Sequence, residues 1–183
     1  MAETRVCPWW LAYFFDNPLR RLFQKPEEIL SPYLKAGMSA LDIGCGMGFY
    51  SIAMAKIVGP QGKIISVDLQ QKMLDILLKR AKRAGVSERI KPNLAERGNI
   101  GVNEKVHFAL AMWMVHEVPG ADRFLGQVKA CLIEKGKFLI AEPKMHVSAL
   151  DFQKTLRIAE ATGLKVVERP KIGISHAAVF EPI

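Results

Sequence analysis

Three glycines at alternate positions, Gly44, Gly46 and Gly48, constrain this chain more than any other feature. They follow directly on the apolar run Ala40–Ile43, which carries the acid Asp42, and a helical pattern comes next. Glycine tolerates positive φ and has no Cβ, so a ligand can lie against the bare backbone of such a turn. The following helix directs its amide donors and the positive end of its dipole at the turn. The stretch therefore predicts a strand, a ligand-binding turn and a helix.

The spacing of the glycines separates two ligand classes. Dinucleotide folds use G-x-G-x-x-G, but Phe49 stands where the last glycine of that pattern would be. A nicotinamide enzyme is therefore disfavoured. The acidic-x-Gly-x-Gly-x-Gly pattern resembles motif I of the class I S-adenosylmethionine (SAM) dependent methyltransferases. The resemblance implies that the following residues hold the methionine and sugar side of SAM: Asp42, Gly44, Cys45, Gly46 and Gly48.

A second acid follows about 20 residues later, at the end of the apolar run Lys63–Asp68. A carboxylate at a strand end can accept hydrogen bonds from both ribose hydroxyls. By resemblance, Asp68 is the ribose acid and Leu69 lies beside the adenine. The alternative is that Asp68 caps the next helix, which begins near Gln70.

Strand and helix patterns alternate along the chain, which predicts a parallel sheet covered on both faces. We predict strands at 38–43, 63–67, 89–94, 105–112 and 136–142, and helices at 48–58, 70–84, 121–134 and 148–162. Two closing strands, 164–168 and 177–180, are joined by a stretch long enough for a loose hairpin. This order resembles the Rossmann-like methyltransferase fold: an α/β, mostly parallel seven-stranded sheet with a C-terminal antiparallel hairpin.

Composition agrees with one α/β domain of 183 residues. Cys7, Cys45 and Cys131 show no metal-site spacing, and we expect reduced thiols in a cytoplasmic protein. No apolar run is long enough to span a bilayer. The net charge is +8, and four of the basic residues lie in the predicted helix at Lys79–Arg83. Few aromatic residues lie between the basic ones. This distribution favours a solvated face over a nucleic-acid site, although RNA stays an alternative.

The adenine side departs from the family pattern. Relatives often carry an acid after the third strand, but no Asp stands at that place in 89–97. Glu96 is one substitute, and the backbone groups of Leu94 and Ala95 are another. The fourth strand also opens with Val106–Phe108 instead of the common Phe-Asp.

Methyl transfer from a sulfonium needs mainly alignment, and a base only where the acceptor loses a proton. By resemblance, Met112 and Trp113 border the transferred methyl group. The absence of an Asn/Asp-Pro-Pro-aromatic motif after them argues against methylation of DNA bases. The His-Glu-Val sequence at 116–118 resembles small-molecule enzymes of the ubiquinone/menaquinone and arsenite methyltransferase type. His116 is a candidate base or could orient an acceptor, and the alternative is a half-buried histidine that packs under the sheet edge. Glu142, at the end of the fifth strand, is a second catalytic candidate or an acceptor for backbone donors.

The N-terminal segment 1–30 is expected to be a helical, aromatic unit ahead of the SAM-binding domain at 31–183. Five of the seven residues at 9–15 are aromatic, and such a patch calls for a burial partner. We favour a lid over the active site. A core helix, a homodimer interface and a membrane-surface contact are the alternatives.

The sequence thus predicts a SAM-dependent methyltransferase acting on a small-molecule acceptor, with no resident metal. An RNA or protein methyltransferase and a non-catalytic SAM-binding protein are the two alternatives. Arsenite as a substrate is disfavoured because nothing brings the three cysteines together.

Overall fold

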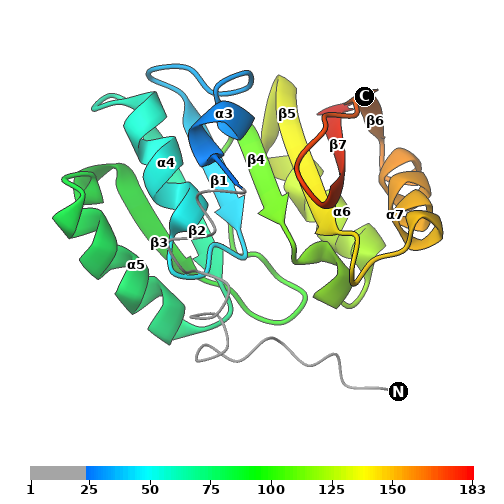
Figure 1. Cartoon of the computed structure of the whole chain (residues 1–183), viewed down its shortest axis with the longest axis horizontal. Helices are drawn as coiled ribbons and strands as arrows, with labels where there is room; N and C mark the ends of the chain where they lie inside the picture. Colours follow the sequence, from blue (N-terminus) through cyan, green and yellow to red (C-terminus); the bar gives the residue numbers. More distant parts are fainter. Residues whose placement is uncertain (1–23) are drawn as a thin grey trace.

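A computed structural model of the chain describes residues 24–183, which form a seven-stranded sheet of order β3-β2-β1-β4-β5-β7-β6 (Figure 1). The first five strands run parallel to their neighbours, and β7 pairs antiparallel with both β5 and β6. The strands are β1 (Ser39–Ile43), β2 (Lys63–Asp68), β3 (Ile90–Leu94), β4 (Val106–Met112), β5 (Leu132–Pro143), β6 (Leu164–Glu168) and β7 (Ser175–Pro182). The predicted fold class is confirmed.

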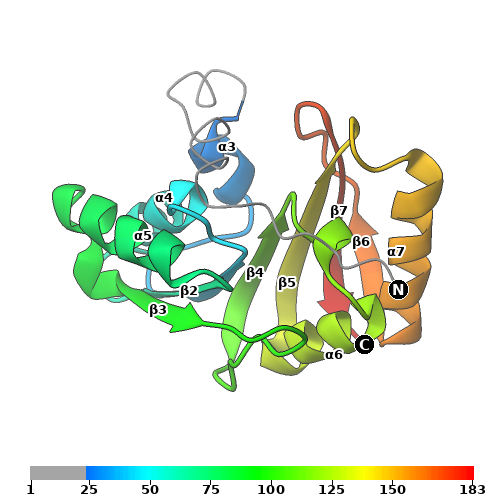
Figure 2. The same ribbon diagram turned by 90° about the horizontal axis from the view of Figure 1, so that it is seen from below.

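The helices cover both faces of this sheet (Figure 2). One face carries α3 (Pro26–Leu30), α4 (Phe49–Val58) and α5 (Gln71–Arg83), and the other carries α6 (Ala121–Cys131) and α7 (Ala149–Ala161). Two short 3-10 turns, η1 (Ser87–Arg89) and η2 (Val115–Glu117), complete the elements. Alternate residues of the central strands enter the two cores: Phe108 and Leu110 of β4 pack with α4, while Ala109 and Ala111 pack with α6. This double burial explains the nearly continuous apolar strand sequences.

The predicted helix at 121–134 is too long at its C-terminal end. The helix ends at Cys131, because Leu132 adopts extended backbone angles and pairs with Val106 of β4. The start of β5 is irregular, with a register shift in this pairing and a positive φ of 61° at Lys135. The other predicted helices and strands of the described part lie close to their expected positions.

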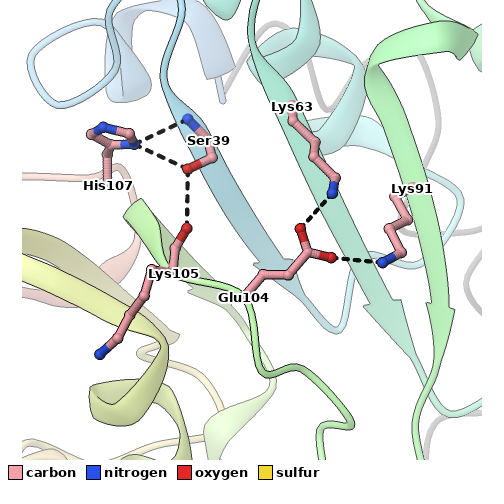
Figure 3. A network of polar contacts seen from close by, with 6 residues as sticks. All are labelled: Ser39, Lys63, Lys91, Glu104, Lys105 and His107. Carbon is pink, nitrogen blue, oxygen red and sulfur yellow. Dashed lines mark hydrogen bonds and ion pairs between the residues drawn. The ribbon is translucent and has the colours of Figure 1, made fainter.

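A network of polar contacts joins the amino ends of the parallel strands (Figure 3). Glu104 accepts hydrogen bonds from Lys63 of β2 and from Lys91 of β3, the second at 2.6 Å. The backbone N–H of Ser39 donates to His107 Nδ1 at 3.1 Å. These contacts join the amino ends of strands β1, β2, β3 and β4. His107 therefore has a structural role, far from the carboxyl ends of the strands.

The predicted N-terminal unit at 1–30 lies almost wholly outside the described residues, as does the aromatic run at 9–15. Its described end, α3, packs on α4 through Leu30, which is fully buried. Among residues 24–183, no helix is long and apolar enough to cross a membrane.

Candidate active site

A cavity of about 1030 Å³ opens at the carboxyl ends of the parallel strands. Its lining comes from the turn after β1, the end of β2, the loop after β3, the segment after β4, and the loops at 143–146 and Ile174. Ligands of open α/β sheets bind at this edge, where the strand order reverses between β1 and β4. The cavity brings together nearly all residues that the sequence singled out for the cofactor.

The three glycines of the turn serve different purposes, although all have positive φ. A Cβ at Gly44 would lie 2.9 Å from Met114 Cγ, and a Cβ at Gly48 would lie 2.1 Å from Leu77 Cδ1. These two glycines allow close packing of the protein against itself. Apart from its chain neighbours, a Cβ at Gly46 would meet no atom of residues 24–183 within 4 Å, although Gly46 lines the cavity. Gly46 is therefore where bare backbone is open to a ligand.

Asp42 lies at the inner end of the cavity and is buried. Its Oδ2 accepts a hydrogen bond of 2.5 Å from Ser51 Oγ, which in turn accepts one of 2.9 Å from Ser66 Oγ. This chain joins β1, α4 and β2 below the glycine turn. Ser51 and Ser66 were not predicted from the sequence. Each is only a small polar residue within an apolar segment, Ser51 in the helix and Ser66 in the strand.

Asp68 holds the turn from the other side. Its Oδ2 accepts the Gly46 N–H and its Oδ1 accepts the Gln70 N–H, both at 2.9 Å. Asp68 thus contacts Gln70, which is the N-cap residue of α5, but makes no capping bond within the helix, and it also faces the cavity. A carboxylate offers about four acceptor positions, so at least one remains for a hydroxyl donor beside the backbone N–H groups. Burial raises the pKa of Asp68, while the backbone N–H groups of Gln70, Gly46 and Leu69 oppose that shift.

The expected adenine end is formed by Leu69, Ala95 and Glu96, all of which line the cavity. Leu94 does not line it and is half exposed. The Ala95 N–H donates to the Asp68 carbonyl at 2.9 Å, so this amide is already used within the sheet edge. An adenine amino group needs an acceptor, so Glu96 and the carbonyl of Ala95, both on residues that line the cavity, stay the substitutes for the missing acid.

Gln127 of α6 fixes the loop that follows β3, and the sequence analysis missed it. Its Oε1 accepts the Ile100 N–H at 3.0 Å, and its Nε2 donates to the Gly98 carbonyl at 2.9 Å. Asn93 Nδ2 donates to the Ile100 carbonyl at 2.9 Å. A single glutamine inside an amphipathic helix gives no sequence signal for such a contact.

Met112 and Trp113 lie where β4 enters the cavity. Trp113 has a φ of 60°, and for a bulky residue this left-handed backbone conformation is strained. Its N–H donates to the Ala141 carbonyl at 2.8 Å, and its Nε1 donates to Ser175 Oγ at 2.9 Å. Both bonds fix the indole at the border between β4 and the C-terminal hairpin.

The two catalytic candidates form a pair that the sequence analysis did not anticipate. Glu142 Oε2 contacts His116 Nδ1, and Glu142 Oε1 accepts the Val115 N–H at 2.8 Å. The hydrogen bond from Glu142 raises the pKa of His116, with burial opposing the shift. Glu142 is 1% exposed and is not among the described residues that line the cavity, whereas His116 lines it. The arrangement orients the imidazole and leaves Nε2 as the ring nitrogen accessible to a ligand.

The described cysteines offer no thiolate for a soft metalloid. Burial and the neighbouring carboxylates of Asp42 and Asp68 raise the pKa of the Cys45 thiol well above its usual value. Burial also raises the pKa of Cys131. Within residues 24–183, no cluster of three His, Cys, Asp or Glu side chains could hold a metal ion.

Comparison with known proteins gives the same answer as the geometry. A family model described as a methyltransferase domain matches residues 34–168. A demethylmenaquinone methyltransferase of Lactobacillus johnsonii is 33% identical over 146 residues, 76% of this chain and 58% of that protein. A ribosomal protein L11 methyltransferase of Dictyoglomus thermophilum is 29% identical over 142 residues, 77% of this chain and 43% of that protein. The chain therefore spans about half the length of the curated relatives that it matches.

The fold also matches a solved structure over nearly its full length. A SAM-dependent methyltransferase from Aquifex aeolicus superposes with a TM-score of 0.87 at 22% identity, covering 97% of this chain and 100% of that one. At this identity the likeness shows the fold alone. Together with the family model and the relatives, it confirms what the glycine turn indicated: the chain belongs to the class I SAM-dependent methyltransferase family.

Proposed function

We propose that this protein binds SAM in the large cavity and transfers its methyl group to a small-molecule acceptor. The observation that carries the proposal is the His116–Glu142 pair, which lies in the same cavity as the Asp68-held glycine turn. The turn gives a place for the cofactor, and the pair gives a base for the acceptor. A cavity of this size exceeds what one drug-sized ligand usually needs, which supports a site for two ligands.

The cofactor would lie along the carboxyl ends of β1, β2 and β4. Asp68 would accept the ribose hydroxyls, and Leu69 would contact the adenine. Gly46 would approach the sugar or methionine part, since its missing Cβ leaves open space. Met112 and Trp113 would then border the sulfonium, whose cationic charge suits the face of an indole.

SAM supplies an activated methyl group, and the protein's own residues align and deprotonate the acceptor. A hydroxyl or amine of the acceptor attacks the methyl carbon as the carbon–sulfur bond breaks, and S-adenosylhomocysteine leaves. His116 Nε2 takes the acceptor proton as the new bond forms. Glu142 holds Nδ1 protonated and stabilises the resulting imidazolium, so Glu142 acts as a positioning residue.

The experiment measures S-adenosylhomocysteine formation from SAM across a panel of phenols, amines and thiols. For acceptors that lose a proton, His116→Gln should lower kcat by about a hundredfold, the usual scale of general-base catalysis. His146→Gln is the matched control. The ring centroids of His146 and His116 lie 6.1 Å apart, and the His146 side chain has no carboxylate contact among the described residues. Equal losses in both variants would refute the assigned base. Cofactor binding without product from any acceptor would favour a non-catalytic SAM-binding protein.

A macromolecular acceptor is the second candidate. One relative is named as a methyltransferase of a ribosomal protein, and the net charge of +8 favours acidic partners. This candidate predicts methylation of protein or RNA and binding that weakens steeply with salt. A small-molecule enzyme would label neither macromolecule.

A further inference from the structure

A second cavity of about 390 Å³ lies between the loop that joins β6 to β7 and the start of α7. The two cavities share a wall made by the loop after β5 and the loop before β7. Pro143, Met145 and Ile174 line the large cavity, whereas their chain neighbours Lys144 and Ser175 line the small one. The Lys144 N–H donates to the Ile174 carbonyl at 3.0 Å, which holds the two loops together.

The small cavity is basic. Lys144, Arg169 and Lys171 line it, and no Asp or Glu is among its described lining residues. None of the three cations has an ion-pair partner within residues 24–183. Three unpaired cations around one small cavity create a positive potential that favours an anion.

Of the acids near these cations in sequence, Glu142 contacts His116, and the other two, Glu168 and Asp151, also have partners of their own. Burial and a hydrogen bond with Glu168 raise the pKa of Tyr33 to about 12, so the acid beside Arg169 is directed at Tyr33. Asp151 accepts hydrogen bonds from Ser148 Oγ at 2.6 Å and from Lys154 at 2.7 Å. Neither acid lines the small cavity. Ala149, at the start of α7, does line it and adds the positive end of a helix dipole.

One hydrogen bond and an apolar rim connect this basic cavity to the methyl-transfer site. Trp113, which lines the large cavity, donates from Nε1 to Ser175 of the small one at 2.9 Å. The rim between the cavities carries two exposed apolar side chains, Met145 at 82% and Ile174 at 58% exposure. An acceptor with its reactive group near His116 and Trp113 could lay an apolar body over this rim.

We propose that the small cavity binds an anionic group of the methyl acceptor, a carboxylate or a phosphate, carried on an apolar body that lies across the rim. The proposal rests on the proposed function for the identity of the ligand, but the anion site itself does not. It narrows the substrate class to acidic, partly apolar small molecules.

The test uses a variant in which all three cations are replaced, Lys144→Gln, Arg169→Gln and Lys171→Gln. The matched control replaces Lys79→Gln, Lys82→Gln and Arg83→Gln on α5, which removes the same charge from exposed positions far from both cavities. Inorganic phosphate and benzoate are titrated into the full chain, and backbone amide shifts near Gly173 are followed by NMR. SAM affinity is measured on the same samples by calorimetry.

We expect both anions to shift these amides in the wild type and in the control, with Kd values within a factor of about two. The cavity variant should bind them about tenfold or more weakly, because charge-assisted contacts are lost. Benzoate binding tighter than phosphate would identify a carboxylate on an apolar body, and the reverse would identify a phosphate. Absence of shifts in the wild type, or equal weakening in the control, would overturn the anion site. Absence of SAM binding with intact anion binding would instead overturn only the proposed function.

Discussion

Gly46→Ala separates a ligand-binding role of the glycine turn from a packing role. The φ of Gly46 is 52°, and the left-handed conformation costs an L residue roughly 1–2 kcal/mol. Beyond the chain neighbours, no atom of the described residues lies within 4 Å of the added Cβ, so these residues add no steric cost in the free protein. We therefore expect the free energy of unfolding to fall by only about 1–2 kcal/mol, which a domain stable by about 5–15 kcal/mol tolerates.

Gly48→Ala is the matched comparison for the same turn. It has a similar φ penalty, but its Cβ would lie 2.1 Å from Cδ1 of the fully buried Leu77. Overpacking in a core adds about 1–3 kcal/mol, so we expect a total loss of about 2–5 kcal/mol. Urea unfolding of the two variants measures this difference.

Calorimetry with SAM then gives the decisive contrast. In Gly46→Ala, the new methyl group occupies space that the cofactor needs, and a clash of about 1–3 kcal/mol weakens affinity by roughly five- to 150-fold. The variant should thus be folded and poor at binding. A folded Gly46→Ala protein that binds SAM within twofold of the wild type would refute the reasoning that the cofactor lies against this glycine.

Three further predictions concern the polar side chains in and below the cavity. Ser51→Ala should lower the free energy of unfolding by about 1–3 kcal/mol in urea titrations, because the buried carboxylate of Asp42 loses the hydrogen bond that Ser51 donates; an unchanged midpoint would contradict this. Glu142→Gln should lower the pKa of His116 towards that of an ordinary histidine, observable by NMR of the imidazole, and an unmoved pKa would rule out the carboxylate as its cause. Folding raises the pKa of His116, so the protonated imidazole stabilises the folded protein. This stabilisation is fully present below the unfolded pKa of about 6.5, and it is lost as the pH rises through the pKa of the folded state. His116→Gln should therefore destabilise the protein more at pH 5.5 than at pH 8.5, and a pH-independent loss would contradict the shift.

Much of the fold was predictable because local patterns and long-range packing agree in a parallel sheet. Buried strands such as β1 and β2 are short apolar runs bounded by glycine or acid, and each predicts its own position. The end of α6 was not predictable, because the pairing of Leu132 with Val106 is a contact between segments distant in sequence. Helix propensity alone continues the helix through 134.

The candidate site was also predictable only in part. Gly46 and Asp68 were found because their spacing along the chain fixes their positions at adjacent strand ends. The pairing of His116 with Glu142 depends on β4 lying beside β5, and neither residue's local sequence indicates the other. The basic cavity was likewise not predictable from the sequence, because Lys144 lies 25 positions before Arg169. The C-terminal hairpin brings the loop after β5 and the loop after β6 together.

Calorimetric titration of SAM and S-adenosylhomocysteine into the wild type, Asp68→Asn and Asp75→Asn tests the central claim most directly. Asp75 is an exposed acid on α5 that contacts only Gln71 among the described side chains, so its variant controls for the change in charge. We predict that the wild type and Asp75→Asn bind both ligands alike, whereas Asp68→Asn loses about tenfold or more in affinity, because hydrogen bonds to a charged group contribute about 1.5–3 kcal/mol each. Equal affinities in all three proteins, or no binding by the wild type, would contradict a cofactor site held by Asp68.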